Sequence, residues 1–237
     1  MHDYLIREEM MFGEAAVARL QNSHVAVFGI GGVGSYAVEA LARAGIGALT
    51  LVDNDTVSVS NLNRQLCALR STVGKSKSDV MAARVLDINP DCAVRSLPLL
   101  YNEESKAAFF DRPYDYIIDA IDLVSCKLSL IQNAMSRGIP IISAMGTGNK
   151  LDPTQFRIAD ISETSGCHLA RIMRRELKAR GIFHHTVLYS QEVPRKPLEL
   201  ETPPPGRRTV PASVSWVPSC AGLMLAGHVI QDLIRAE

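Results

Sequence analysis

Four glycines and one acidic residue in the first quarter of the chain have types and spacing suited to nucleotide binding. The stretch HVAVFGIGGVGSYAVEALARAG contains four closely spaced glycines, namely Gly29, Gly31, Gly32 and Gly34. Between a strand and a helix, such glycines allow a tight turn, let the backbone approach a phosphate and let the helix pack on the strand. Asp53 ends the next apolar run, where a carboxylate accepts hydrogen bonds from ribose hydroxyls. This pattern predicts a nucleotide site, and NAD, FAD and ATP fit it equally well.

Charged residues that follow Asp53 favour a triphosphate. SNLNRQ carries Asn61 and Arg64, GKSKSD carries Lys77, and DAID ends at Asp122. A dinucleotide's pyrophosphate is held largely by backbone amides, whereas a leaving pyrophosphate carries charge that an arginine and a lysine would stabilise. A carboxylate such as Asp122 beside phosphates is suited to hold Mg²⁺.

Each of these charges also has an ordinary structural interpretation. Arg64 could form a surface ion pair, Lys77 could be a solvated cation at a helix start, and Asp122 could cap a helix over 126–137. Their convergence on one sheet edge favours a shared ligand over three unrelated roles.

The elements that would position these residues alternate between strands and helices. Apolar runs predict strands over 24–29, 48–53, 93–97, 116–120 and 140–144. Helical patterns predict helices over 34–44, 73–90, 102–110 and 126–137. In the second of these helices, the inward side chains are expected to be Val80, Ala83, Val85 and Leu86. The alternation predicts an α/β fold with a doubly wound, mostly parallel, Rossmann-like sheet flanked by helices.

The pattern changes after Lys150. Strands are expected over 154–161 and 184–190 with a helix over 169–180 between them, and the proline-rich 191–212 is expected to be a flexible loop. Residues 214–234 include a proline, a histidine and an aspartate, which favours a buried helix over a membrane span. We therefore expect an ATP-binding core with an N-terminal helix over 1–150 and a smaller α+β extension over 151–237 that completes the sheet.

Composition narrows the class of protein. The chain has 237 residues, 47% of them hydrophobic, and its 25 basic residues balance 25 acidic ones. This balance is not that of a strongly basic nucleic-acid binder. The five cysteines form no CxxC pair, which argues against a disulfide framework and a four-cysteine zinc site and favours a reducing cytoplasm. The first residues, MHDYLIREEMMFGE, are not typical of a signal or transit peptide.

The motifs together resemble a known family. GxGGxG, DxDxVxxSNLxRQ, GKxK and DAxD, all present between Gly29 and Asp122, resemble the ubiquitin-activating-enzyme-like, ThiF-type adenylating superfamily. Within it the chain is most similar to the tRNA threonylcarbamoyladenosine dehydratases. REEMMFGEAAVARL, MGTGNKLDPTQFRIADISET and HLARIMRRELKARG carry that similarity.

The resemblance implies a site and a reaction. It implies ATP and Mg²⁺ as cofactors, Asp122 as the metal ligand, and a nucleotide site that includes Gly32, Asp53, Asn61, Arg64, Lys77 and Asp122. Arg7 matches an arginine that reaches the partner subunit's ATP, which implies a homodimer. The implied substrate is tRNA carrying threonylcarbamoyladenosine, whose carboxylate is adenylated before ring closure releases AMP. Sulfur-relay proteins are further partners that the resemblance suggests.

Two other functions compete with this one. A related adenylating enzyme would activate a small ubiquitin-like sulfur-carrier protein, but such enzymes typically carry CxxC zinc pairs, which are missing here. A nicotinamide-dependent oxidoreductase, or a nucleotide-binding module without turnover, would leave Arg64, Lys77 and Asp122 unexplained.

The second half offers weaker signals. Arg171, Arg174, Arg175 and Lys178 share one helical flank, which suits either tRNA phosphates or a solvated helix face. Cys167 and Cys220 fit buried small side chains better than reactive thiols, so neither is assigned to catalysis.

Overall fold

A single seven-stranded sheet organises the protein. The computed structural model describes residues 3–198, 200 and 210–235. Its strands are β1 (His24–Phe28), β2 (Ala48–Val52), β3 (Ala93–Leu97), β4 (Tyr116–Asp119), β5 (Ile141–Ala144), β6 (Phe156–Asp160) and β7 (Thr186–Ser190). They lie in the order β3-β2-β1-β4-β5-β7-β6. All neighbouring pairs are parallel except β6 and β7, which are antiparallel.

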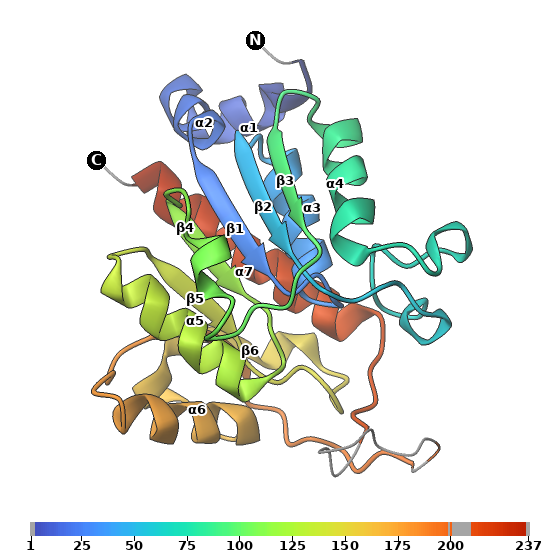
Figure 1. Ribbon diagram of the computed structural model, residues 1–237, viewed down its shortest axis with the longest axis vertical. Coiled ribbons are helices and arrows are strands. Elements are labelled where there is room, and N and C mark those ends of the chain that lie inside the picture. The colour runs from blue at the N-terminus through green and yellow to red at the C-terminus, as the bar shows by residue number, and fades with distance from the viewer. Residues whose placement is uncertain (1–2, 199, 201–209, 236–237) are drawn as a thin grey trace.

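Helices cover both faces of this sheet (Figure 1). They are α1 (Ile6–Phe12), α2 (Glu14–Gln21), α3 (Gly34–Arg43), α4 (Lys77–Ile88), α5 (Val124–Ser136), α6 (His168–Lys178) and α7 (Trp216–Arg235). α7 crosses behind the sheet in Figure 1 and packs on α2 and α3, while α5 and α6 pack on each other on the opposite face. Each face has its own apolar core, one containing Leu41 and Leu225 and the other Ile131 and Met173.

The fold class predicted from the sequence is confirmed. The mostly parallel sheet with flanking helices follows from short β-branched runs that alternate with amphipathic helices. The order of the strands changes direction between β1 and β4, so their carboxyl ends open onto the crevice in which such folds bind ligands. The chemistry of the protein is therefore expected at that edge.

The predicted helix over 102–110 is wrong. Only a 3-10 turn, Lys106–Phe109, forms there. Asn102 and Ser105 bond reciprocally, each side chain accepting from the other's backbone N–H, at 2.8 and 3.0 Å. Ser105 also donates to the carbonyl of Leu100. These local side-chain bonds compete with an α-helical start.

The predicted inward face of α4 is also partly wrong. Val85 is buried, but Ala83 and Leu86 are exposed, and Leu86 is 45% accessible. Met81 and the aliphatic stem of Lys77 occupy the inward side instead. Lys77 faces inward because its ammonium pairs with Asp55 at the sheet edge. A search for periodic apolar residues does not detect such a buried lysine.

Residues after Lys150 extend the same sheet. β7 pairs with β5, and β6 adds the outermost strand. The division into parts at residue 150 stays a prediction. Of the proline-rich stretch 191–212, the described residues 191–198, 200 and 210–212 form neither helix nor strand, and the remainder lies outside the described residues.

One helix in the described part of the chain, α7, is long and apolar enough by composition to cross a membrane. Here it is a core helix, because Val217, Ala221, Leu225 and Val229 are buried against the sheet side of the molecule. All five cysteines are free thiols, and all but Cys220 are buried.

Candidate nucleotide-binding site

A cavity of about 860 Å³ opens at the carboxyl ends of the central strands. Its lining includes the residues that follow β1, β2, β4 and β5, together with the start of α6 and the segment before α7. Most of the residues predicted from the sequence line it, namely Gly29, Gly31, Gly32, Asp53, Asn61, Arg64, Lys77 and Asp122. Gly34 and Arg7 do not.

The glycine loop is shaped by packing at its ends and is open in its middle. Gly29 has a φ of +89°, and a Cβ there would lie 2.6 Å from the carbonyl oxygen of Ala120. A Cβ on Gly34 would lie 1.7 Å from the carbonyl oxygen of Gly29, so Gly34 serves the contact between strand and helix. A Cβ on Gly31 would meet nothing closer than the Gln65 side chain, at 3.8 Å. The backbone at Gly31 is therefore accessible to a ligand.

Asp53 links this loop to the edge of β2. One carboxylate oxygen accepts from the backbone N–H of Ile30 at 2.6 Å, and the other accepts from the N–H of Asp55 at 2.8 Å. Burial raises the pKa of the Asp53 carboxyl, while the positive charge of Lys77 and these two donors act in the opposite direction. The carboxylate is held facing the cavity beside the glycine loop.

Lys77 places its positive charge at the first residue of α4. The hydroxyl of Ser76 caps this helix by accepting from the N–H of Asp79. The Lys77 side chain is only 7% exposed, and its Nζ lies 2.8 Å from Oδ2 of Asp55. The ammonium is thus a buried, oriented cation rather than a solvated one. The sequence analysis did not single out Asp55, although it belongs to the same DND motif.

Asn61 and Arg64 belong to one compact turn. The Asn61 Oδ1 accepts from the N–H of Ser58 at 3.1 Å, closing a capping box. Arg64 donates to the carbonyl of Ser60 at 2.8 Å and to Oδ1 of Asn63 at 2.9 Å. Both acceptors are neutral, so within the described residues this guanidinium is held in place without a carboxylate partner.

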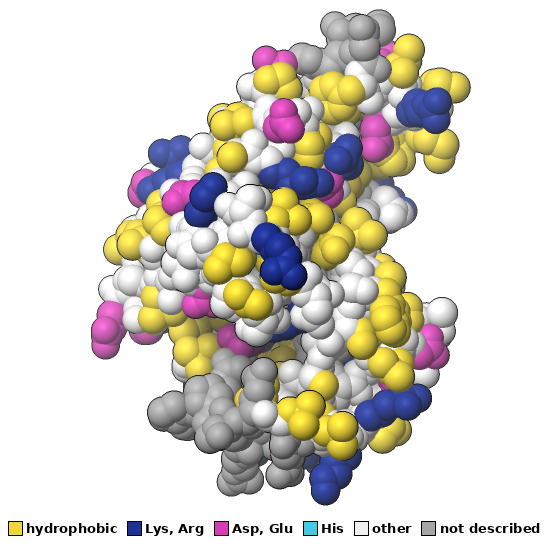
Figure 2. Space-filling view, turned by 90° about the vertical axis from the view of Figure 1, so that its right-hand side faces the viewer, with side chains coloured by type: hydrophobic (Ala, Val, Ile, Leu, Met, Phe, Trp, Pro, Cys, Tyr) yellow, Lys and Arg dark blue, Asp and Glu magenta, His cyan; other side chains and the backbone are white. Residues whose placement is uncertain are grey.

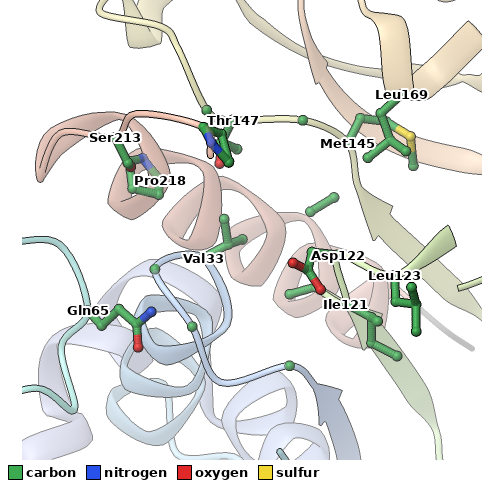
Figure 3. Close-up of a pocket in the computed structure, with 18 of the residues that line it drawn as sticks. Val33, Gln65, Ile121, Asp122, Leu123, Met145, Thr147, Leu169, Ser213 and Pro218 are labelled. Carbon is green, nitrogen blue, oxygen red and sulfur yellow. The ribbon is translucent and has the colours of Figure 1, made fainter. Parts of the chain in front are cut away.

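Asp122 is exposed in the loop between β4 and α5. The N-cap of α5 is Leu123, so Asp122 does not cap that helix. Figure 3 shows Asp122 in the middle of the cavity, between Val33 on the glycine-loop side and Met145 on the other side. Its position suits a group that contacts both a nucleotide and a second reactant.

A buried polar chain supports this loop, and the sequence analysis missed it. Asp119, fully buried at the end of β4, accepts from the Nζ of Lys127 and from the Oγ of Ser143, each at 2.6 Å. Its other oxygen accepts from the N–H of Ile121 at 3.1 Å. The ring of His185 contacts the Ser143 hydroxyl at 2.8 Å. Because β4, β5, α5 and the residue before β7 supply these groups, sequence spacing does not indicate them.

The proton order along this chain is defined by its acceptors. Ser143 gives its hydroxyl hydrogen to the Asp119 carboxylate, so Nε2 of His185 must donate to the Ser143 oxygen. Nδ1 of His185 then carries a lone pair and has no partner in the described structure. Burial, followed by the charge of Lys127, lowers the pKa of His185 to about 3. The imidazole is neutral at physiological pH.

The far wall of the cavity contains residues that were not predicted as site residues. Met145, Thr147 and Lys150 follow β5, and Cys167 and Leu169 lie at the start of α6. Figure 3 places Met145, Leu169 and Thr147 across the cavity from Gln65 and Val33. Residues of the nucleotide motif thus line one side of the cavity, and residues after β5 and at the start of α6 line the other.

The carboxylates present suit a magnesium ion that is shared with a ligand. Within the described residues, no group of three or more His, Cys, Asp or Glu side chains is placed to hold a metal ion. Mg²⁺ commonly binds through one or two carboxylates plus substrate phosphates rather than through a cage of protein ligands. Asp122, exposed at the phosphate-accessible edge, fits that type of site.

Arg7 lies elsewhere. It is exposed on α1, does not line the cavity of its own chain, and neighbours the exposed apolar side chains Ile6, Met10 and Met11. The structure of one chain therefore leaves Arg7 apart from the other predicted site residues.

Known proteins share this sequence and architecture. The ThiF family model matches residues 6–236. The tRNA threonylcarbamoyladenosine dehydratase of Bacillus subtilis is 46% identical over 238 residues, covering 97% of this chain and 94% of that protein. The crystal structure of the Escherichia coli tRNA N6-threonylcarbamoyladenosine dehydratase TcdA in complex with ATP superposes with a TM-score of 0.88. It is 34% identical, covering 98% of this chain and 93% of that one.

A sulfur-transfer relative matches a shorter region. The adenylyltransferase and sulfurtransferase UBA4 of Vanderwaltozyma polyspora is 37% identical over 150 residues, covering 63% of this chain and 34% of that protein. The match of the family model across nearly the whole chain, together with the full-length bacterial relative, is decisive. The protein belongs to the ThiF family.

Proposed function

We propose that the protein is an ATP-dependent tRNA threonylcarbamoyladenosine dehydratase. The observation that carries this proposal is the 46% identity to a dehydratase along almost the whole of both chains. The cavity geometry agrees with it, because the cationic and acidic side chains of the motif surround the accessible glycine-loop backbone.

The reaction first needs an activated carboxylate. An oxide ion is a very poor leaving group, so the threonine carboxylate attacks the α-phosphorus of ATP, and an acyl-adenylate and pyrophosphate form. The ureido group of the same substrate then attacks the acyl carbon, closing a ring as AMP leaves. No general base is needed for the first step, because this carboxylate is already ionised at neutral pH. The protein's task is mainly to position groups and neutralise charge.

The proposed roles follow from the geometry of each side chain. The carboxylate of Asp53, beside the glycine loop, orients the ribose. The buried ammonium of Lys77 and the guanidinium of Arg64 stabilise the charge on the leaving pyrophosphate. Asn61 holds the turn that presents Arg64. Asp122 would hold Mg²⁺, which offsets negative charge on the phosphate oxygens when it is bound.

A homodimer would bring Arg7 to a second cavity. α1 has no buried residue among those described, and three of its own apolar side chains, Ile6, Met10 and Met11, are exposed. An exposed apolar helix of this kind is typical of a contact surface. We propose that α1 packs against the partner subunit and that Arg7 contributes charge to the partner's nucleotide.

The positive charge available for tRNA is less concentrated on α6 than the sequence pattern predicts. Arg174 turns inward and donates to the carbonyl and hydroxyl oxygens of Thr164, at 2.6 and 2.7 Å, and Arg175 is bonded to Glu176 at 2.8 Å. On the face shown in Figure 2, Lys and Arg side chains are scattered singly among apolar and acidic ones. We propose tRNA contacts that are distributed around the cavity mouth. The reaction would take place in the cytoplasm, with sulfur-relay proteins as partners.

The adenylation of a sulfur-carrier protein is the second candidate. It would use the same nucleotide residues, and the partial match to UBA4 is the observation that favours it. An assay with a carrier protein that ends in Gly-Gly separates the two functions, because only carrier activation would exchange pyrophosphate in the absence of tRNA.

The direct test uses purified protein, ATP, Mg²⁺ and tRNA bearing the threonylcarbamoyl group. We expect release of AMP and, by mass spectrometry of the nucleosides, loss of one water from the modified adenosine. An unchanged nucleoside mass with folded protein would reject this function.

Substitution of Asp122 tests the site. We expect Asp122→Asn to reduce turnover at least about 100-fold, as the loss of a charge aimed at reacting groups typically does. Its thermal stability should match the wild type, because Asp122 is exposed. Full activity of this variant would remove Asp122 from the proposed machinery.

A further inference from the structure

Lys150 is a buried cation that lines the cavity beyond the end of β5. It is 4% exposed, and its Nζ donates to the carbonyl of Ser190 at 3.2 Å. An ammonium has three N–H donors, and the described residues supply this single acceptor. No carboxylate of the described residues lies within salt-bridge distance. Lys150 therefore presents unused donors to a cavity that it lines.

The residue before Lys150 has an unusual conformation that fixes it in place. Asn149 has a φ of 62°, the one non-glycine residue with positive φ in the described chain. Its N–H donates to Ala212 and its side-chain oxygen accepts from the N–H of Ala212, at 2.8 and 2.7 Å. Its carbonyl accepts from the N–H of Arg195 at 2.8 Å. Backbone conformations of this kind persist where surrounding contacts over-determine them, and they concentrate at functional sites.

The two residues after Lys150 bind the carboxylate of Glu192. The carboxylate of Glu192 accepts from the N–H groups of Leu151 and Asp152, each at 2.9 Å. This carboxylate is thereby directed at the backbone instead of at the Lys150 ammonium. The segment is held on both sides, and among the described residues Lys150 has no carboxylate partner.

A cation in this environment favours an anionic ligand. Burial lowers the pKa of the Lys150 ammonium from its usual value, while Cys167 and then Glu192 act in the other direction. An anion that entered the cavity would supply the missing acceptor and recover the cost of burying the charge. The cations of the nucleotide motif, Lys77 and Arg64, line the same cavity, and Figure 3 shows Asp122 between the glycine-loop side and the side of Met145.

We propose that Lys150 binds the substrate carboxylate that is to be adenylated. This assignment rests on the proposed function and names the protein group that recognises the acyl substrate. The ammonium holds one carboxylate oxygen while the other forms a bond to the α-phosphorus, and the electron pair of the broken phosphorus–oxygen bond leaves with pyrophosphate. Lys150 remains protonated throughout, and the hydrogen bond serves to aim the nucleophile.

A binding cycle isolates this contact. Affinity is measured for tRNA with and without the threonylcarbamoyl group, with a non-hydrolysable ATP analogue bound, for the wild type and Lys150→Met. We expect the wild type to prefer the modified tRNA about 10-fold or more, because hydrogen bonds to charged groups contribute that much. In Lys150→Met this preference should disappear, while affinity for unmodified tRNA and for the ATP analogue should stay within about twofold. Lys106→Met is the matched control, since Lys106 is partly exposed and lies outside the cavity.

Steady-state kinetics provide the second arm. The value of kcat/KM for modified tRNA should fall by about 10- to 100-fold in Lys150→Met and in Lys150→Gln. The KM for ATP should be unchanged. A raised KM for ATP with intact discrimination between the two tRNAs would place Lys150 on the triphosphate and overturn the proposal. The proposal would also be overturned if either variant kept the wild-type preference for modified tRNA and the wild-type turnover.

The control for the underlying function is the wild-type protein. If it fails to dehydrate the tRNA and shows no preference for the modified form, the proposed function fails. If the wild type is active and the Lys150 variants match it in discrimination and turnover, only the assignment of Lys150 fails.

Discussion

At the scale of single residues, the fully buried Asp119 carboxylate depends most strongly on its counterion. Lys127→Met removes its counterion and leaves a buried negative charge, so we expect the free energy of unfolding to fall by about 3–5 kcal/mol. Chemical denaturation measures this difference. Lys106→Met, which removes one partner of an exposed pair with Glu103, should have a far smaller effect. Equal effects of the two substitutions would contradict the role of burial.

His185 makes stability depend on pH. Its pKa is about 3 in the folded protein and near 6.5 in the unfolded chain, so between these values the unfolded state binds one more proton. Unfolding therefore becomes easier as the pH falls below about 6.5. We expect the wild type to lose about 1.2 kcal/mol more than His185→Gln between pH 6 and pH 5. Parallel curves for the two proteins, from denaturation at several pH values, would argue against a neutral buried imidazole.

At the scale of elements, two glycines of α7 provide a matched pair. A Cβ on Gly222 would lie 2.2 Å from the carbonyl oxygen of Val33 in the glycine loop, whereas a Cβ on Gly227 would meet nothing within 4 Å. Gly222→Ala should destabilise the protein by about 1–3 kcal/mol and weaken ATP binding, because the loop must move. Gly227→Ala should stabilise it by about 0.5–1 kcal/mol through the better helix propensity of alanine.

Thermal unfolding and titration with an ATP analogue test both variants. If Gly222→Ala binds the analogue with wild-type affinity, the contact between α7 and the glycine loop does not shape the nucleotide site.

The sequence predicted the elements whose signal is local. Strand and helix positions around the glycine loop followed from short apolar runs and from glycine spacing, and they brought the charges of Arg64, Lys77 and Asp122 to one cavity. No local pattern assigns a role to Lys150, or to Asp119 as the first residue of the DAxD motif. Their partners are supplied by other strands and loops, so their importance depends on tertiary contacts that no periodicity encodes.

At the scale of the whole molecule, the proposed homodimer would bring Arg7 to the nucleotide of the partner subunit. Arg7→Ala and Asp122→Ala proteins should each be inactive if Arg7 serves the partner's cavity. After equal mixing and exchange of subunits, about half of the dimers should be heterodimers, each with one intact site and one inactive site. About a quarter of the wild-type activity should therefore return. The assay is AMP release, with sedimentation used to measure the mass of the particle. A mixture that stays inactive, or a monomeric mass, would contradict this arrangement.

The packing of α7 against the glycine loop means that the nucleotide site is completed late in translation. Pro218 lies against Gly32 and Gly222 against Val33, although the loop leaves the ribosome about 180 residues before this helix does. Nascent chains halted before residue 216 would expose the loop without its support. We therefore expect ATP to be captured only after the helix has emerged, so that incomplete translation products do not sequester nucleotide.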